Sequence, residues 1–191
     1  MHSGIKALSS AIYVEAIEHS DEIVSAIRER SSVLESEGYH SQVLVEEDYF
    51  PLFWIDENGK RTALRKRVHG SYRIKGERRE FTRDELIQIA RNDPQHLSPG
   101  VMLRPAVQDY LLPTVCYFGG GAEIAYFAQN SEAYRGLKRP ITPFLHRQSF
   151  TIIESKQRRA LDKFDLTLAR LFDGSEKITL QIARNILPDD T

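Results

Sequence analysis

Residues 97–129, LSPGVMLRPAVQDYLLPTVCYFGGGAEIAYFAQ, form the stretch that decides the fold. Two short apolar runs within it, Val101–Leu103 and Thr114–Phe118, have the composition of buried strands. Each run precedes a helical pattern: one from Pro105 to Leu112, with proline at its first position, and one from about Ala122 to Asn130. Strands that alternate with helices predict an α/β fold with an open sheet, in which ligands bind beyond the carboxyl ends of the strands.

Upstream of this stretch, residues 1–41 are predicted to be a helical segment that leads into the core. Ser20-Asp21-Glu22 has the pattern of an N-cap followed by acidic first-turn residues. We therefore expect two helices, or one broken helix, that end before Gly38. The apolar residues of this segment recur at roughly helical spacing, at Ile12, Ile17, Ile23, Ile27 and Leu34.

The next part of the chain has the pattern of short strands. Gln42–Glu46 alternates between polar and apolar residues, and Phe50–Ile55 is aromatic and β-prone. Asp56-Glu57-Asn58-Gly59 supplies a turn before a second run, Arg61–Arg67. We therefore predict a hairpin, extended by Ser71–Lys75.

A capping box follows these strands, because Thr82 and Glu85 stand three residues apart before an apolar run, and the helix it predicts closes before Asp93-Pro94. Residues 42–92 are thus predicted to form a small β-rich inserted lobe, and residues 93–191 a segment of the core. In that segment we expect a further strand or two in Ile141–Ile153, a closing helix at Lys156–Phe172 and a frayed end at Pro188–Thr191.

Composition limits the functional classes. The 191 residues carry a net charge of -1, which gives the chain no overall attraction to nucleic acid or to an anionic membrane. No apolar run approaches the roughly 20 residues that cross a bilayer, and MHSGIKALSS lacks the order of a secretory signal, so we expect a cytoplasmic protein. The six histidines lack metal-ligand spacing, which predicts no metal site. Cys116, in the apolar run TVCYF, is expected to be buried and unreactive.

The first candidate site is the turn Gly119-Gly120-Gly121. Glycines after a buried strand let the backbone approach a ligand, and the helix that follows offers unpaired N–H groups to a phosphate or carboxylate. The alternative is a tight turn that only packs strand against helix, since GGG matches neither common phosphate-binding motif. Glu123 suits both interpretations, because it complements the helix dipole yet would repel an anion.

The second candidate site is polar and lies on the preceding helix, where Arg104, Gln108 and Asp109 stand between apolar residues. We expect them to form one pocket with the glycine turn; an ion pair between Arg104 and Asp109 that only fixes the local packing is the alternative. Tyr126 and Gln129 follow at helical spacing and are expected to face the same cleft. His146 and Arg147, at the end of a predicted strand, complete the candidate set, although an exposed pair on a loop is the more common interpretation of such residues.

A basic run between residues 60 and 83 raises nucleic-acid binding as a further hypothesis, although such a run is more often the solvated face of a hairpin. Its cations are Lys60, Arg61, Arg65, Lys66, Arg67, Arg73, Lys75, Arg78, Arg79 and Arg83.

With these residues in view, the chain resembles the BshC family, the cysteine-adding enzymes (cysteine ligases) of bacillithiol biosynthesis. The resemblance is carried by Ser98-Pro99, Leu103-Arg104-Pro105, Val107–Thr114, Gly119-Gly120 and Ala122–Gln129; it continues at Arg147, Ser149-Phe150-Thr151 and Glu154, and more weakly at Gly38–Val43.

The resemblance implies a Rossmann-like open sheet core with inserted lobes and a coiled coil. It also implies a carbon–nitrogen ligation that joins the carboxyl of cysteine to the amine of glucosaminyl-malate. These two small molecules are the implied partners, with a homodimer as one assembly of the full-length protein. No nucleic acid or membrane is implied, and ATP or another nucleotide stays open as the activating cofactor.

In that reaction Arg104 and the amides of Gly119–Gly121 would hold a carboxylate or phosphate. The remaining polar groups would orient an amine or hydroxyl, and no nucleophile or general base is assigned. These groups are Gln108, Asp109, Glu123 and Gln129.

The chain departs from the family at three positions: Gly100 replaces a common Asn, Gly121 a usual Pro, and His146 a common Pro. The family's amino-terminal half, with its TGQQ segment, and its C-terminal coiled coil have no counterpart. We therefore expect the isolated chain to be inactive. The rival hypothesis is a non-catalytic truncated fragment or a small-molecule-binding domain of the same family.

Overall fold

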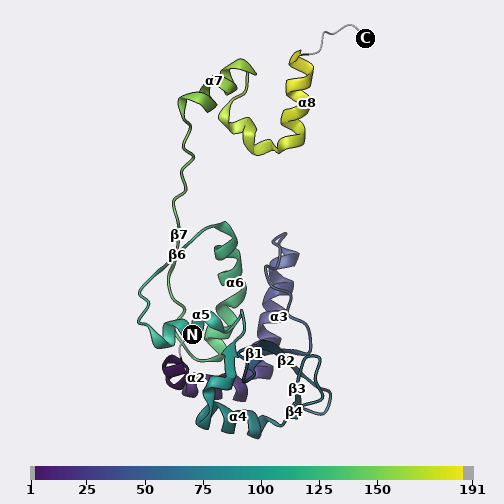
Figure 1. The fold of residues 1–191 in the computed structure, drawn as a ribbon, viewed down its shortest axis with the longest axis vertical. Coiled ribbons are helices and arrows are strands. Elements are labelled where there is room, and N and C mark those ends of the chain that lie inside the picture. The colour runs from purple at the N-terminus through teal and green to yellow at the C-terminus, as the bar shows by residue number, and fades with distance from the viewer. Residues whose placement is uncertain (1–2, 187–191) are drawn as a thin grey trace. The chain divides into compact units, whose positions relative to one another are not determined.

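The computed structural model describes residues 3–186, which fall into two compact units divided between Arg147 and Gln148 (Figure 1). Each unit is described by itself below. The predicted lobe, residues 42–92, lies in the first unit together with the helices that flank it. The frayed end predicted at Pro188–Thr191 lies outside the described residues.

The chain begins with three consecutive helices, α1 (Ser3–Leu8), α2 (Ser10–Glu18) and α3 (Ser20–Ser36). Breaks at Ser9 and His19 separate them, so the prediction of a broken helical segment that ends before Gly38 is confirmed. One face of α2 and the first half of α3 is buried in the core, through Ile12, Tyr13, Ala16, Ile17, Ile23, Val24 and Ile27.

The predicted hairpin is confirmed as β1 (Tyr49–Ile55) and β2 (Arg61–Lys66), which pair antiparallel. Its turn is stabilised by Asp56, whose Oδ1 accepts hydrogen bonds from the amides of Asn58 at 2.9 Å and Lys60 at 2.8 Å. Gly59 takes the positive φ of 78° that this turn requires.

The strand predicted at Gln42–Glu46 is wrong, because these residues form bends and irregular backbone. The physical reason lies 86 residues away on helix α6 (Gly121–Gly136). There the Gln129 side chain accepts from the amide of Val43 at 3.1 Å and donates to its carbonyl at 2.7 Å. The backbone groups that a strand would pair with another strand are thus held by a side chain.

Three further strands extend the hairpin into one antiparallel sheet with the order β4-β3-β2-β1-β5. They are β3 (Tyr72–Ile74), β4 (Glu80–Phe81) and β5 (Leu97–Pro99). Helix α4 (Arg83–Asn92) follows β4, and a short 3-10 turn, η1 (Pro94–His96), leads into β5. The capping box is confirmed: Thr82 Oγ1 accepts from the Glu85 amide at 3.2 Å, and the Glu85 carboxylate accepts from the Thr82 amide at 2.7 Å.

The strand predicted at Val101–Leu103 is wrong as well. The amides of Leu103 and Arg104 donate to the carbonyl of Gly100, at 3.1 and 2.9 Å, so the chain turns directly into helix α5 (Arg104–Leu111). Met102 and Leu103 are nevertheless fully buried. A turn therefore buries two of the three residues of this apolar run, while Val101 is exposed, and the nearby strand is β5, which pairs with β1.

The α/β part of the fold follows α5. Strand β6 (Tyr117–Gly119), helix α6 (Gly121–Gly136) and strand β7 (Phe144–His146) form a β–α–β unit, whose strands pair in parallel. Strand β6 is shorter than the predicted Thr114–Phe118, and β7 is the single strand of the predicted region Ile141–Ile153. The mixture of helices, an antiparallel sheet and this parallel pair confirms the predicted α/β class.

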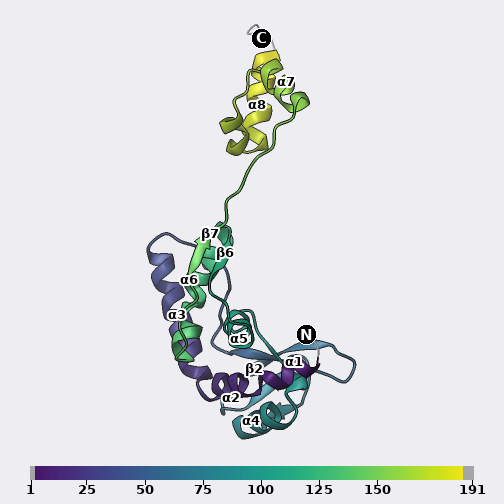
Figure 2. The same ribbon diagram turned by 90° about the vertical axis from the view of Figure 1, so that its left-hand side faces the viewer.

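Helices α3 and α6 lie side by side in both views (Figures 1 and 2). Arg30 on α3 donates from Nε to the carbonyl of Ala128 on α6 at 3.1 Å. Gln129 donates to the hydroxyl of Ser31 at 2.8 Å. These contacts join the N-terminal helices to the β–α–β unit.

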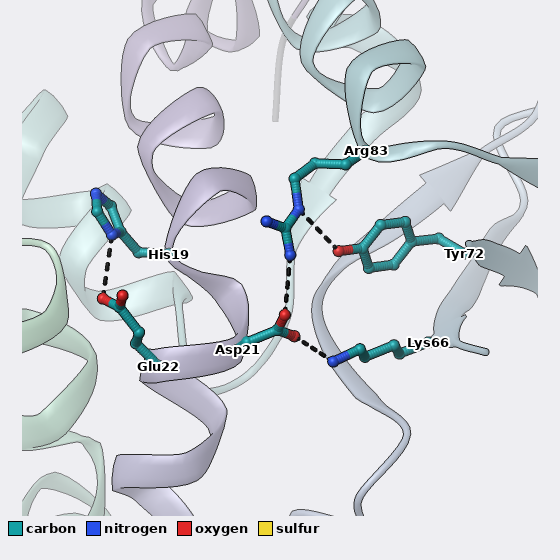
Figure 3. Close-up of polar contacts among 6 residues, drawn as sticks. All are labelled: His19, Asp21, Glu22, Lys66, Tyr72 and Arg83. Carbon is teal, nitrogen blue, oxygen red and sulfur yellow. Dashed lines mark hydrogen bonds and ion pairs between the residues drawn. The ribbon is translucent and has the colours of Figure 1, made fainter. Parts of the chain in front are cut away.

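A charged cluster joins α3, the sheet and α4 (Figure 3). The Asp21 carboxylate, in the first turn of α3, accepts from Lys66 Nζ at 2.6 Å and from Arg83 Nη2 at 2.9 Å. Arg83 also reaches the hydroxyl of Tyr72, at 3.4 Å. Burial alone would raise the pKa of Asp21, but the hydrogen bonds and charges of Lys66 and Arg83 outweigh it and lower that pKa.

The second unit contains α7 (Ser155–Lys163), the 3-10 turn η2 (Leu168–Asp173) and α8 (Ser175–Ile186). The single closing helix predicted at Lys156–Phe172 is wrong, because the chain leaves the helix at Phe164 and takes a positive φ of 49° at Asp165. Among the helices of residues 3–186, none is long and apolar enough to cross a membrane.

Candidate functional site

Helices α5 and α6 wall a pocket of about 280 Å³ in the first unit. Five of the residues singled out from the sequence line it: Arg104, Gln108 and Asp109 from α5, and Glu123 and Tyr126 from α6. The structure therefore brings together two sets of polar side chains that are separated in sequence. The other lining residues are Val101, Pro105, Tyr117 and Phe127.

Asp109 is held firmly at the wall of this pocket. Its Oδ2 accepts a hydrogen bond of 2.6 Å from the Tyr134 hydroxyl and a second one from the Thr142 hydroxyl. Burial raises the pKa of Tyr134, and the hydrogen bond to Asp109 and the charge of that carboxylate raise it further. Tyr134 therefore stays protonated and remains a donor to Asp109.

Arg104 does not form the ion pair with Asp109 that the sequence left open. Among the described residues, no hydrogen bond or ion pair joins these two side chains, although both line the same pocket. The Arg104 side chain is exposed at the first position of α5. Its guanidinium is thus available to a ligand.

Tyr126 closes one side of the pocket as a neutral phenol. Its hydroxyl donates to the carbonyl of Val101. Burial raises the pKa of Tyr126 well above the ordinary tyrosine value, while the charge of Arg104 acts in the opposite direction. Tyr126 therefore contributes shape and a fixed dipole to the site, and no charge.

The glycine turn lies next to the pocket and does not line it. A side chain at Gly119 would overlap the ring of Phe144 and approach Glu123, whereas nothing lies within 4 Å of a Cβ at Gly121. The amide of Gly120 already donates to the Glu123 carboxylate at 2.6 Å. One amide of the anion site expected at Gly119–Gly121 is therefore occupied by the chain's own side chain.

Three predicted site residues lie away from the pocket. Gln129 is buried and bonds to Val43 and Ser31, so its amide holds the fold together. His146 is exposed at the end of β7, and Arg147 donates its backbone amide to Gly119 at 2.7 Å, which prolongs the β6–β7 pairing. The expectation that Gln129 faces the same cleft as Tyr126 is wrong.

An aromatic wall is the feature that sequence reasoning missed. The rings of Tyr117 and Phe127 lie 4.9 Å apart, and each also packs against Phe144, at 5.1 and 4.8 Å. Phe127 stands four residues after Glu123, one helical turn along the same face, so helical spacing could have indicated it. No sequence pattern of this kind indicated that Tyr117 lines the pocket.

Cys116 is half-buried, and the prediction of full burial is wrong. The β6 strand begins one residue later, so Cys116 lies in the loop that leads to the strand, where its thiol contacts the carbonyl of Tyr117 at 3.8 Å. It does not line the pocket. Within residues 3–186, no group of histidine, cysteine or carboxylate side chains is arranged to hold a metal ion.

Several cations of the basic run between residues 60 and 83 are neutralised by neighbouring carboxylates. Arg65 bonds to Glu46 at 2.9 Å and to Asp48 at 2.8 Å, and Lys66 and Arg83 share Asp21. Arg73 pairs with Glu80 across β3 and β4. This pattern favours the solvated face of a sheet over a nucleic-acid surface.

The lining residues can hold a small molecule that carries both charges. They comprise one guanidinium, two carboxylates and one neutral amide, set against aromatic rings. The free acceptors are Asp109 Oδ1 and Glu123 Oε1, since Oδ2 and Oε2 already accept hydrogen bonds. No nucleophile paired with a base occurs among the lining residues, so they position a ligand and do not by themselves attack it.

Comparison with known proteins places these observations in a family. Residues 1–148 match the family model described as "Bacillithiol biosynthesis BshC, N-terminal Rossmann-like domain". Relatives named "Putative cysteine ligase BshC" come from Koribacter versatilis, 34% identical over 96% of this chain, and from Solibacter usitatus, 36% identical over 98% of this chain. A third, from Chlorobaculum tepidum, is 39% identical over 70% of this chain. The alignments cover 34%, 34% and 23% of the respective relatives, so this chain spans about a third of their length or less.

Proposed function

The chain belongs to the BshC family, and from that premise we propose that it forms part of a cysteine ligase, which adds cysteine to glucosaminyl-malate in bacillithiol biosynthesis. A role in bacillithiol biosynthesis is supported by the family model and by the relatives' names. The substrate and the share of the reaction that this chain performs are the proposal.

The pocket between α5 and α6 is proposed to bind cysteine. An amino acid at neutral pH carries a carboxylate and an ammonium group, and the lining offers a partner for each. Arg104 would receive the carboxylate through a charge-assisted hydrogen bond, and Asp109 and Glu123 would receive the ammonium. The presence of both charges in one wall is the observation that carries the assignment.

The size of the pocket supports cysteine over a nucleotide or the larger amino-sugar substrate. Pockets for drug-sized ligands measure about 300–1,000 Å³, and this one, at about 280 Å³, lies at the lower limit. The aromatic wall of Tyr117 and Phe127 would face the thiol-bearing side chain, because sulfur packs favourably against aromatic rings.

The chemistry assigns these residues a positioning role. Joining a carboxylate to an amine forms a C–N bond and removes one carboxylate oxygen, which must leave as part of an activated group. The lining supplies no such group, and ATP or another nucleotide stays open as its source. Arg104 would orient the cysteine carboxyl, and positioning of this kind contributes to catalysis only when the opposing groups are also in place.

We therefore propose that the isolated chain binds its substrate and does not complete the reaction. The rival function is a small-molecule-binding domain without any part in ligation. The two differ in ligand choice, since a ligase subunit must discriminate cysteine by both of its charged groups. Binding of cysteine analogues separates them.

Calorimetric titration of the chain tests the proposal with three probes. Cysteine carries both charged groups, N-acetylcysteine lacks the ammonium, and cysteamine lacks the carboxylate. We expect cysteine to bind most tightly and each analogue to lose about tenfold or more, because each removes one charge-assisted bond. Equal affinity for all three would contradict the assignment.

The same titration with Arg104→Ala gives the residue-level test. We expect about 10- to 100-fold weaker cysteine binding, equivalent to about 1.5–3 kcal/mol, and no change in the affinity of cysteamine. Arg91→Ala is the matched control, because Arg91 is an exposed arginine on α4 outside the pocket. A loss of cysteine binding in both variants would show that the effect is not specific to the site.

A further inference from the structure

The solvent-facing side of strands β2 and β3 brings two arginines directly opposite each other. In the antiparallel register Arg65 pairs with Arg73, while the next pair along, Leu64 and Ile74, is buried in the core. Like charges that face each other across two strands destabilise a sheet. This arrangement therefore needs anions nearby.

The chain supplies some of these anions itself. Arg65 Nη1 donates to Glu46 at 2.9 Å and to Asp48 at 2.8 Å, and Arg73 Nε donates to Glu80 at 2.8 Å. Internal carboxylates thus account for the central pair of arginines, as they do on an ordinary solvated face.

Two further cations on the same face, Arg67 and Lys75, have no such counterion. The strand pairing continues through both positions, because the Arg67 amide donates to Ser71 and the Lys75 amide donates to Ala63. Strand alternation therefore places both on the side of Arg65. Both side chains are exposed, and within residues 3–186 neither forms a hydrogen bond or an ion pair.

The cations of this face surround a hollow of about 310 Å³. Its lining holds four cations against two carboxylates, an excess of two positive charges, and consists of Arg65, Arg67, Arg73, Lys75, Glu46, Asp48 and Gly76. The chain as a whole has a net charge of -1, so the excess is local. Both carboxylates already bond to Arg65, which leaves the charges of Arg67 and Lys75 uncompensated.

The positions of the two unpaired cations indicate the length of the anion. Arg67 and Lys75 lie on opposite sides of the Arg65–Arg73 pair, four residues apart along the strands, which corresponds to about 13 Å between their backbones. A single phosphate bound to one of them would leave the other unpaired, whereas a chain of phosphates reaches toward both. The two arginines between them present guanidinium groups, whose geometry suits phosphate oxygens.

We propose that this hollow binds a phosphate chain, either free polyphosphate or the triphosphate of a nucleotide, with its ends at Arg67 and Lys75. Nucleic acid suits it less, because a hollow of this size takes one short chain and because several other cations of the basic run are already paired. The hollow shares no lining residue with the pocket between α5 and α6, so the inference does not rest on the proposed binding of cysteine.

Calorimetric titration of the chain without divalent cations tests the proposal. We expect inorganic triphosphate to bind at least tenfold more tightly than orthophosphate, because only the chain reaches both unpaired cations. ATP and adenosine distinguish the two sources. Binding of triphosphate and ATP alike would identify the phosphate chain as the recognised group, and binding of triphosphate alone would identify free polyphosphate. Binding of ATP and adenosine without triphosphate would contradict the proposal.

Two matched pairs of variants give the residue-level test. Arg67→Gln and Lys75→Gln should each weaken triphosphate binding by at least tenfold. Arg78→Gln and Lys60→Gln, at exposed cations of the same basic run outside the hollow, should not. Equal losses in all four variants would show a diffuse attraction between charges, and would overturn the proposal, as would the absence of triphosphate binding to the wild-type chain.

Thermal unfolding provides a second readout. Triphosphate should raise the unfolding midpoint of the wild-type chain, since a ligand that binds the folded state stabilises it, and should not raise that of Arg67→Gln to the same extent. Without triphosphate, Arg67→Gln should be at least as stable as the wild type, because it removes a repelling charge. A marked loss of stability in the ligand-free variant would assign Arg67 to the fold and contradict the proposal.

Discussion

The hydroxyl of Tyr134 on α6 donates a 2.6 Å hydrogen bond to the carboxylate of Asp109 on α5, which fixes one wall of the pocket to the other. Asp109 Oδ2, which accepts this bond, also accepts a hydrogen bond from the hydroxyl of Thr142, just before β7. Helix α6 and the segment before β7 thus both bind one carboxylate of α5. Asp109 keeps its second oxygen for a ligand, so the bond serves both the fold and the site.

Tyr134→Phe is expected to lower the free energy of unfolding by about 1–2 kcal/mol, because a part-buried bond to a charged group is lost while the ring is kept. Urea denaturation measures the change. Tyr110→Phe is the matched control, since the face of the Tyr110 ring packs against Arg139 and this contact survives the substitution. A similar loss in both variants would show that Asp109 is not the cause.

Gly119→Ala and Gly121→Ala form a second matched pair. The first adds a methyl group that overlaps Phe144, and we expect it to destabilise the chain by about 1–3 kcal/mol. The second adds a methyl group in open space at the first position of α6, and we expect up to about 1 kcal/mol of stabilisation. Thermal unfolding of both variants measures the two effects. A Gly119→Ala variant at least as stable as Gly121→Ala would contradict the prediction.

Asp21→Asn tests the charged cluster through its dependence on pH. The pKa of Asp21 is lowered in the folded protein, so its carboxylate stabilises the fold above the ordinary value of 3.8, and this stabilisation is lost as pH falls through the folded-state pKa. Because the side chain is 47% exposed, we expect a loss of roughly 0.5–1 kcal/mol at pH 7.

The difference between wild type and Asp21→Asn should then shrink toward zero at pH values below the folded-state pKa of Asp21. Glu57→Gln, at an exposed turn position, is the control and should show no such dependence. A difference that stays constant from neutral to acidic pH would mean that the asparagine perturbs packing and that charge plays no part.

The pair Gln129→Leu and Gln108→Leu distinguishes a glutamine that stabilises the fold from a glutamine that lines the pocket. Removing the buried amide leaves the backbone of Val43 unpaired, and we expect a loss of about 2–4 kcal/mol without a direct effect on ligand contacts. Gln108→Leu should give the opposite pattern: nearly unchanged stability and altered ligand affinity, because Gln108 is exposed in the pocket lining. Denaturation and titration of both variants provide the check.

Local interactions explain which elements the sequence predicts well. The hairpin turn is specified by Asp56 and Gly59, and the start of α4 by Thr82 and Glu85, all within a few residues of one another. The failures have distant causes. Residues 42–46 do not form a strand because Gln129, 86 residues from Val43, binds the backbone of Val43. Met102 and Leu103 are buried by a turn, which composition alone does not distinguish from a strand.

In the candidate site, too, the sequence predicts local spacing but not contacts between distant segments. Helical spacing correctly places Glu123 and Tyr126 on one side of α6, three residues apart. Gln129 is six residues from Glu123, which turns it about 120° away around the helix and toward α3. The sequence could not show which side of α6 would be taken by α3, because that packing joins segments about a hundred residues apart.

A crystal structure of the chain grown with saturating cysteine tests the central claim most directly. We predict cysteine in the pocket between α5 and α6, with its carboxylate within hydrogen-bond distance of the Arg104 guanidinium and its ammonium against Asp109 or Glu123. Cysteine bound elsewhere, or glucosaminyl-malate bound in this pocket in place of cysteine, would contradict the account.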